Sequence, residues 1–204
     1  RPEDGLRTDE CLRALEAAVC GRLPGGKEWR VQAFGSAVNG FGTRDCDLDV
    51  VMCNETDAQE GNVAIAQSVL GQLAQLFDGS GFHVKQQVLH ARVPLLRLQY
   101  MDQEVDLTVN NSRPLLNTRL LRAYADLDPR VAELGIAVKQ WAKDRELCGA
   151  SSGHLSSYAF TLMAIYYLQV AHAPAMPCLQ PDFMGEPDGG HRGRGRGGGG
   201  PAPG

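Results

Sequence analysis

Residues 34–49 read FGSAVNGFGTRDCDLD, and this stretch decides the predicted fold. It follows the alternating residues 29–34, which predict a strand, and it runs into residues 48–52, whose Val and Leu content predicts a second strand. Gly35 permits a close turn, and we expect Ser36 to begin a short helix. The free N–H groups at such a helix start bind phosphate oxygens. The sequence therefore predicts a strand, a phosphate-binding turn and an Asp-x-Asp pair in succession.

Three aspartates predict a metal site. Asp47 and Asp49 lie two residues apart at the start of a strand, so both carboxylates point to one face, with their backbones roughly 7 Å apart. Asp106 alternates with Val105 and Leu107 in another predicted strand, where an unpaired carboxylate is costly to bury. Carboxylates are the ligands that Mg²⁺ prefers, and a pair of such ions supports phosphoryl transfer. We therefore expect Mg²⁺ or Mn²⁺ at these aspartates; the alternative for Asp-x-Asp alone is an exposed loop.

The rest of the chain predicts a mixed α/β unit followed by helices. Thr8 is the expected N-cap of a first helix over residues 8–22. Periodicity predicts the following further elements: a helix over 62–77, strands over 82–89, 93–101 and 103–109, and helices over 114–125, 129–147 and 155–171. The tail, 181–204, is dominated by Gly, Pro and Arg towards its end, so we expect it to be disordered. The predicted fold class is α/β (α+β), with a mixed sheet and a mainly helical second part.

Composition excludes several classes of protein. The formal net charge is −4, whereas a protein that grips a long duplex is usually basic, so any nucleic-acid contact must be local. No apolar run approaches the ~20 residues that span a bilayer, and the N-terminus lacks a signal-peptide core. The six cysteines include no C-x-x-C pair, so neither a zinc site nor a redox dithiol is predicted. These features favour a cytoplasmic protein that makes no membrane contact.

The stretch 34–49 resembles the signature of the DNA polymerase β-like nucleotidyltransferases, and within them the terminal uridylyltransferases and the related cytoplasmic poly(A) polymerases. The resemblance continues in these segments: ARVPLL (91–96), VDLTVNN (105–111), NT (117–118), DPR (128–130), VKQWAK (138–143) and LSSY (155–158). It implies a nucleotidyltransferase catalytic domain over 24–112. It also implies a helical domain formed by 1–23 and 113–180.

The resemblance implies a role for each matching residue. The three aspartates would hold the metal ions, and Asp106 would also help to deprotonate the RNA 3′-hydroxyl. Ser36 would contact the triphosphate, as would Lys139 and Lys143, which their i, i+4 spacing places on one helix face. Tyr158 would stack on the base. The full set of implied nucleotide contacts is Phe34, Gly35, Ser36, Asn111, Thr118, Lys139, Lys143, Ser157 and Tyr158.

Alternatives remain open for several of these residues. Lysines at this spacing commonly form a solvated face, Tyr158 fits the interior of an apolar helix, and Asn111 fits a turn. The implied reaction is template-independent transfer of UMP from UTP to an RNA 3′ end. Poly(A) synthesis from ATP and an inactive RNA-binding relative are the alternatives. A later family loop that reads the base edge has no counterpart after Gln180, so we expect an incomplete helical domain and no sequence marker of base preference.

Overall fold

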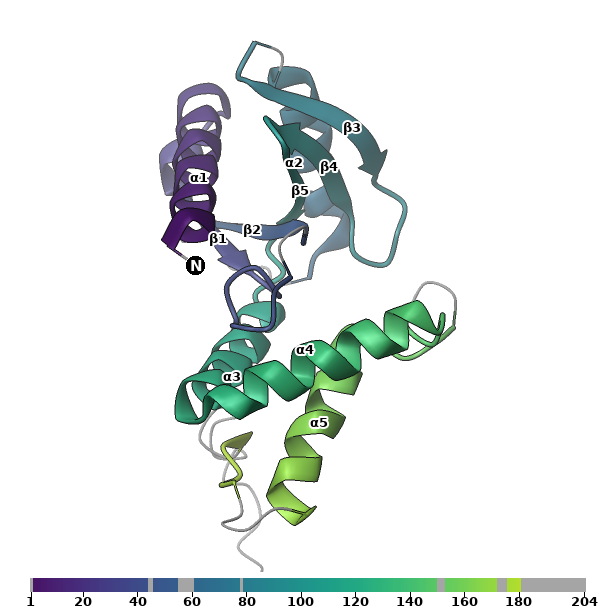
Figure 1. The fold of residues 1–204 in the computed structure, drawn as a ribbon. Coiled ribbons are helices and arrows are strands. Elements are labelled where there is room, and N and C mark those ends of the chain that lie inside the picture. Colours follow the sequence, from purple (N-terminus) through teal and green to yellow (C-terminus); the bar gives the residue numbers. More distant parts are fainter. Residues whose placement is uncertain are drawn as a thin grey trace, which may run out of the picture.

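The computed structural model describes residues 2–43, 46–54, 61–77, 79–149, 153–171 and 176–180. In chain order the elements are α1 (Pro2–Arg22), the 3₁₀ turn η1 (Gly26–Glu28), β1 (Trp29–Phe34), β2 (Leu48–Asn54), α2 (Val63–Leu76), β3 (Phe82–Val88), β4 (Leu95–Tyr100), β5 (Gln103–Val109), α3 (Arg113–Leu127), α4 (Pro129–Asp144) and α5 (Ser157–Ala171). Figure 1 shows the sheet, α1 and α2 in one half of the molecule and α3, α4 and α5 in the other. The predicted fold class is confirmed.

Two local predictions are wrong, although the other expected strands and helices form within about three residues of their predicted bounds, apart from the start of α1. Thr8 lies inside α1, which begins earlier, so it does not cap that helix. The stretch after Gly35 is a turn rather than a helix, in which the backbone N–H groups of Val38 and Asn39 both donate to the Gly35 carbonyl. Its glycines disfavour continued helix. The tail predicted to be disordered, 181–204, lies outside the described residues.

The five strands form one mixed sheet in the order β1-β2-β5-β4-β3. Only β2 and β5 run parallel; the other neighbours are antiparallel. The parallel register places Asp49 opposite Asp106. The tight connection between β4 and β5 then places Arg97 opposite Asp106 on its other side. Because residues that pair across a sheet share a face, these three side chains lie in one row.

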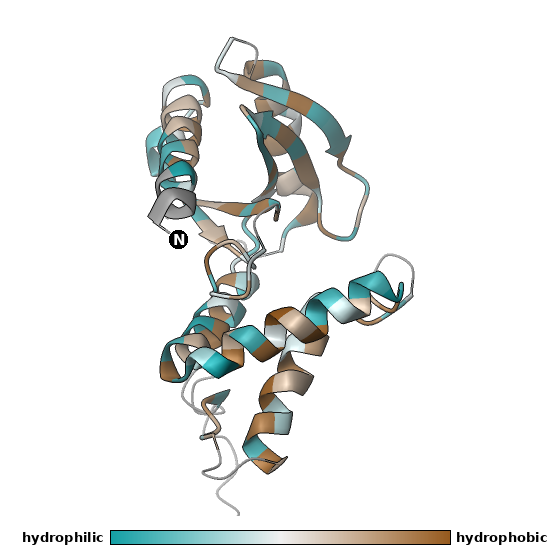
Figure 2. Ribbon diagram, in the orientation of Figure 1, coloured by the Kyte–Doolittle hydropathy of each residue, from teal (hydrophilic) through white to brown (hydrophobic). Residues whose placement is uncertain are grey.

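One face of the sheet, here called the covered face, is apolar and packs against α1 and α2. Leu96, Leu98, Val105 and Leu107 are fully buried there. Burying a side chain of this size stabilises the fold by about 1.5–3 kcal/mol. Figure 2 shows the resulting alternation of apolar and polar residues along the strands. Although the sequence grouped 1–23 with the later helices, the buried side chains of α1 belong to this core.

The other face of these strands, here called the open face, carries Asp49, Asp106 and Arg97 at its centre. A second apolar cluster lies in the helical half and joins α3, α4 and α5. One of its buried members, Phe41, comes from the loop between β1 and β2 rather than from a helix. Its ring lies against Gly135 of α4, where an added Cβ would stand 2.5 Å from the ring. No described helix is both long and apolar enough to cross a membrane.

Candidate active site

The structure brings the three aspartates to one place on the open face. Asp49 lies in β2 and is the direct neighbour of Asp106 across the parallel pair. Asp47 is exposed and lies immediately before β2. The proximity of Asp49 and Asp106 follows from strand pairing alone, because a parallel register aligns residues that are far apart in the sequence.

The electrostatics of the site are those of three crowded negative charges. Burial, followed by the charges of Asp106 and Asp47, raises the pKa of Asp49 to about 6. The positive charge of Lys139 acts in the opposite direction and is the weakest of these influences. A carboxylate whose ionised form is disfavoured by its neighbours gains from any cation placed among them.

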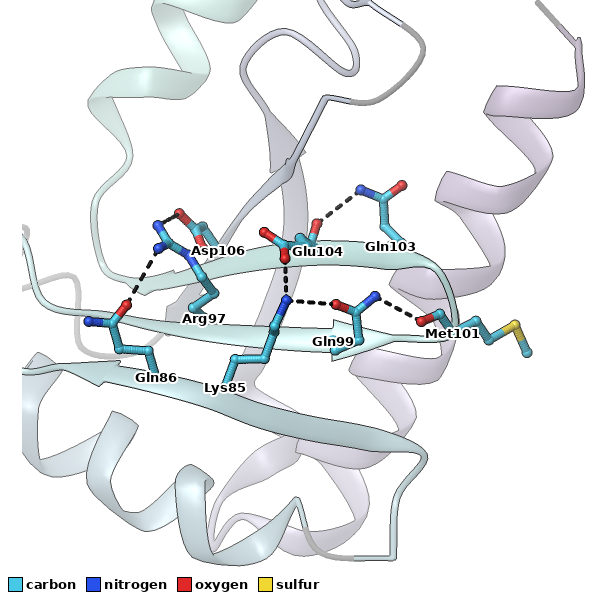
Figure 3. Close-up of polar contacts among 8 residues, drawn as sticks. All are labelled: Lys85, Gln86, Arg97, Gln99, Met101, Gln103, Glu104 and Asp106. Carbon is cyan, nitrogen blue, oxygen red and sulfur yellow. Dashed lines mark hydrogen bonds and ion pairs between the residues drawn. The ribbon is translucent and has the colours of Figure 1, made fainter. Parts of the chain in front are cut away.

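Arg97 supplies a cation to this cluster. Its Nε donates to Oδ1 of Asp106 at 2.9 Å, and a terminal guanidinium nitrogen donates to Oδ2 at 3.0 Å. This hydrogen-bonded pairing raises the pKa of Arg97. Figure 3 shows Arg97 between Asp106 and Gln86, whose side-chain oxygen accepts a further hydrogen bond at 3.4 Å. Both oxygens of the third carboxylate are therefore engaged by one guanidinium.

The donor set fits a hard divalent cation, since the three aspartates offer only carboxylate oxygens and carry an excess of negative charge. The side chains are not yet arranged around one point. Within the described parts of the chain, no three carboxylate, imidazole or thiol groups converge closely enough to hold an ion as they stand. The residues thus match the chemistry of Mg²⁺ or Mn²⁺, and their side chains must reorient to bind it.

A cavity of about 220 Å³ opens beside the carboxylates, between the sheet and the helices. It is lined by Phe34, Gly35, Ser36, Asn39, Phe41, Asp49, Pro114, Asn117, Thr118, Leu121, Lys139, Ser157, Tyr158 and Thr161. Most nucleotide contacts implied by the sequence are therefore gathered around one space. Asp47, Asp106, Asn111 and Lys143 do not line it.

The turn at Gly35 forms one wall of this cavity. Gly35 has φ +74°, and a Cβ there would lie 2.3 Å from Oδ2 of Asp49. Only glycine therefore allows the backbone to approach the carboxylate so closely. The N–H of Gly35 donates to the hydroxyl of Thr118 at 2.9 Å, and that hydroxyl donates to the Pro114 carbonyl at 2.8 Å. The start of α3 thus fixes the position of the turn.

The two predicted triphosphate lysines differ in their surroundings. Lys139 is buried, 5% exposed, and donates to the Phe41 carbonyl at 2.8 Å. Burial, followed by the charge of Lys143, lowers its pKa. Lys143 is exposed at the solvent side of the same helix. A buried ammonium with one neutral partner retains strong attraction for an anion, so Lys139 is the stronger anion-binding candidate.

The remaining predicted contacts also differ, because one lines the cavity and another lies outside it. Tyr158 lines the cavity, and its hydroxyl donates to the side-chain oxygen of Asn117 at 3.3 Å. Asn111 lies in the connection between β5 and α3, outside the cavity lining. Its neighbour Asn110 is buried in a left-handed turn and accepts a hydrogen bond from the Asn54 N–H at 3.1 Å. That role is structural, as expected for a residue that ends a strand.

Sequence reasoning missed several residues of the site: Asn39, Phe41, Arg97, Asn117 and Thr161. A signal for Arg97 existed. A two-residue turn after Tyr100 pairs that residue with Gln103, and three steps further along the hairpin Arg97 stands opposite Asp106. Phe41 and Thr161 gave no such signal, because their positions depend on how the loop docks on α4 and α5.

A mixed sheet with this strand order, paired aspartates on adjacent strands and a Gly-Ser turn beside them define a polymerase β-like nucleotidyltransferase. A family model described as the central palm domain of mitochondrial-like poly(A) RNA polymerase matches residues 3–126. The chain therefore belongs to that family of nucleotidyltransferases.

Curated relatives include enzymes of two nucleotide preferences. Terminal uridylyltransferase 7 of Homo sapiens is 38% identical over 188 residues, which are 90% of this chain and 12% of that protein. Poly(A) RNA polymerase GLD2 of Danio rerio is 34% identical over 183 residues, which are 89% of this chain and 37% of that protein. The chain thus spans a minor part of either relative.

Solved structures show the same fold. One described as the GLD-2/RNP-8 complex matches with a TM-score of 0.76 and 31% identity, over 88% of this chain and 56% of that chain. Terminal uridylyl transferase 4 from Trypanosoma brucei with bound UTP and UMP matches with a TM-score of 0.68 and 26% identity, over 81% of this chain and 54% of that chain. The chain therefore corresponds to about half of these solved proteins.

Proposed function

We propose that this chain is the catalytic part of a template-independent RNA 3′-terminal nucleotidyltransferase that adds UMP from UTP and depends on Mg²⁺ or Mn²⁺. One observation carries the proposal. Two carboxylates on adjacent strands, with a third immediately before one of them, lie beside a cavity whose lining includes a Gly-Ser turn and a buried lysine. That combination supports a cation-binding role for the carboxylates and a pocket that accepts an anionic, partly aromatic ligand.

The side chains at the site have separate proposed roles. Ser36 and Lys139 are placed to hold the triphosphate, because both line the cavity and one carries a positive charge. Tyr158 presents a ring on which a base stacks, worth about 1–3 kcal/mol per base. Asp106 accepts the proton of the attacking 3′-hydroxyl. When bound at Asp47, Asp49 and Asp106, divalent cations supply activation of that hydroxyl and neutralisation of the departing pyrophosphate.

A second candidate is poly(A) synthesis from ATP. It is favoured by the similarity to GLD2 of Danio rerio and by the TM-score of 0.76 with the GLD-2/RNP-8 structure. Among the described residues that line the cavity, the only charged side chains are Asp49 and Lys139, which have proposed roles towards the metal ions and the triphosphate and so do not favour uracil over adenine. Cytoplasmic localisation remains a prediction.

The test is a primer-extension assay with a short RNA and each nucleoside triphosphate supplied alone, in Mg²⁺ and then in Mn²⁺. We expect extension of the primer with UTP, and loss of all extension when EDTA removes the metal. Extension with ATP alone would replace the uridylyl assignment with the second candidate.

Asp47→Ala is the matched catalytic control. Asp47 is exposed and precedes β2, so its removal spares the core while it removes one proposed metal ligand. Extension by this variant at the wild-type rate would contradict the metal-dependent mechanism. A circular dichroism spectrum identical to that of the wild type would show that any loss is not caused by unfolding.

A further inference from the structure

Arg97 has no part in the proposed reaction, yet it makes a two-bond contact with Asp106 on the open face. Its guanidinium meets both oxygens of Asp106, at 2.9 and 3.0 Å, in the bidentate geometry that favours this pairing. The pairing is built in by register, because Arg97 of β4 is the direct cross-strand partner of Asp106. The ion pair therefore follows from the register of the hairpin and not from a chance encounter of two side chains.

The contact offsets part of the negative charge that the three aspartates bring to the site. Asp49 and Asp106 are aligned neighbours of like charge, an arrangement that destabilises a pair of strands. The charges of Asp47 and Glu104 also act on Arg97, so the guanidinium offsets part of the negative charge around Asp106. The protein thus carries its own positive charge at the place where the proposed function requires a metal ion.

A guanidinium and a metal ion cannot share this position without cost. An ion bound at Asp106 would lie within a few Å of the guanidinium, and their like charges would repel. Arg97 has room to withdraw, because its side chain is 39% exposed whereas that of Asp106 is 17% exposed. The present orientation of the carboxylates, in which no three groups of the described chain converge on one point, agrees with a site held by the arginine.

We propose that Arg97 is a built-in counter-ion that competes with divalent metal ions for the Asp106 carboxylate. In the metal-free protein it stabilises the acidic cluster, and metal binding displaces it. Arg97 therefore sets the metal affinity of the site as a positioning residue, acting through Asp106. The inference rests on the proposed metal-dependent function and adds a regulator of its metal occupancy.

The test measures Mn²⁺ binding to the purified chain, without nucleotide or RNA, by isothermal titration calorimetry and by the electron paramagnetic resonance signal of free Mn²⁺. We expect Arg97→Gln to bind Mn²⁺ about tenfold more tightly than the wild type, because one opposing charge is removed at close range. Arg97→Lys keeps the charge but loses the bidentate fit, so its affinity should lie between the two.

Lys85→Gln is the matched control. Lys85 donates to Glu104 and to Gln99, at 3.2 Å for the latter, and it lies on the same face, as Figure 3 shows. Its removal changes the net charge as Arg97→Gln does but leaves Asp106 untouched. We expect its Mn²⁺ affinity to stay within about twofold of the wild type, since an exposed ion pair has only a small effect on its surroundings.

A second measurement covers the case in which Arg97→Gln weakens the fold. Thermal unfolding is followed with EDTA and with Mn²⁺, and the Mn²⁺-induced rise in Tm is compared between variants. That rise should be larger in Arg97→Gln than in Lys85→Gln. An affinity of Arg97→Gln equal to or weaker than that of the wild type would overturn the counter-ion proposal. If no variant binds Mn²⁺, the proposed metal-dependent function fails with it.

Discussion

The two faces of the β4–β5 hairpin differ in what they carry, although they are made from alternate residues of the same strands. On the covered face Leu98 and Leu107 are fully buried against the helices. On the open face, one residue away, Arg97 and Asp106 form a part-exposed ion pair. Adjacent residues of these strands therefore serve different purposes: one face stabilises the fold, and the other carries the polar groups of the site. Substitutions on the two faces should therefore have different consequences.

The largest expected effect is loss of nucleotide transfer in Asp49→Asn. The substitution removes a proposed ligand of the metal ions. Because bound metal ions supply several kcal/mol of transition-state stabilisation, the rate of primer extension should fall roughly a thousandfold. In EDTA the same variant should melt at a higher temperature than the wild type, because it relieves crowding with Asp106. A lower Tm together with normal transfer would show that Asp49 contributes to stability and not to nucleotide transfer, so the two faces would not differ in function.

Leu107→Ala tests the covered face. Leu107 is fully buried in the sheet core, so truncation should lower the free energy of unfolding by about 3 kcal/mol through lost burial and a cavity. Urea unfolding measures this loss. Leu107→Ile, of equal volume, should cost less than about 1.5 kcal/mol. At a temperature where the Ala variant stays folded, its Mn²⁺ affinity should match that of the wild type, and a large change would show that the faces are coupled.

The pH dependence of stability provides a third comparison. The pKa of Asp49 is raised from 3.8 to about 6, so the folded protein holds this proton more tightly than the unfolded chain does. The corresponding stability is fully present below the unfolded pKa and is lost as pH rises through about 6.

In EDTA, the difference in unfolding free energy between wild type and Asp49→Asn should therefore shift by roughly 1.5 kcal/mol in favour of the wild type between pH 8 and pH 5. Urea titrations of both proteins at the two pH values measure the difference and cancel the titration of other groups. No shift would show that Asp49 ionises in the folded protein as it does in the unfolded chain, and a shift of opposite sign would show that folding lowers its pKa.

The smallest expected effect concerns α2, which covers the sheet but does not reach the site. The side chain of Asn62 caps this helix by accepting hydrogen bonds from the N–H groups of Ala64 and Ile65. Asn62→Ala should lower the free energy of unfolding by about 1 kcal/mol, with Asn62→Ser close to the wild type. Primer extension at low temperature should not change, and a specific loss of transfer would assign α2 a role in the site.

Local patterns predicted the parts of the fold that depend on short-range chemistry. Strand 29–34 matches because its first residues alternate between a more buried and an exposed face, and strand 103–109 matches on its Val and Leu content although its last three residues are all buried. Asp49 and Asp106 come together because the sequence places each on a strand and parallel pairing does the rest, while Asp47 immediately precedes one of these strands. The roles of the individual site residues stay predictions, since a fold alone does not show which groups touch a ligand.

The parts that could not be predicted depend on contacts between distant segments. The turn after Gly35 is held by Thr118 of α3, a partner that no local propensity reveals. The ion pair of Arg97 follows from hairpin register, which requires the turn to be known first. The burial of Lys139 depends on the Phe41 carbonyl, which reaches it only when the loop docks on the helices.

Phe41 has a mechanical consequence for the molecule. Its ring is wedged against Gly135 in the helical half, while its chain is continuous with the β1–β2 loop that begins at Gly35. Any hinge motion that widens the angle between the two halves must either extract this ring or drag the loop along with it. Access to the cavity and the shape of the wall that the turn at Gly35 forms should therefore change together, and a fluorophore on the loop would report a change in the angle between the two halves.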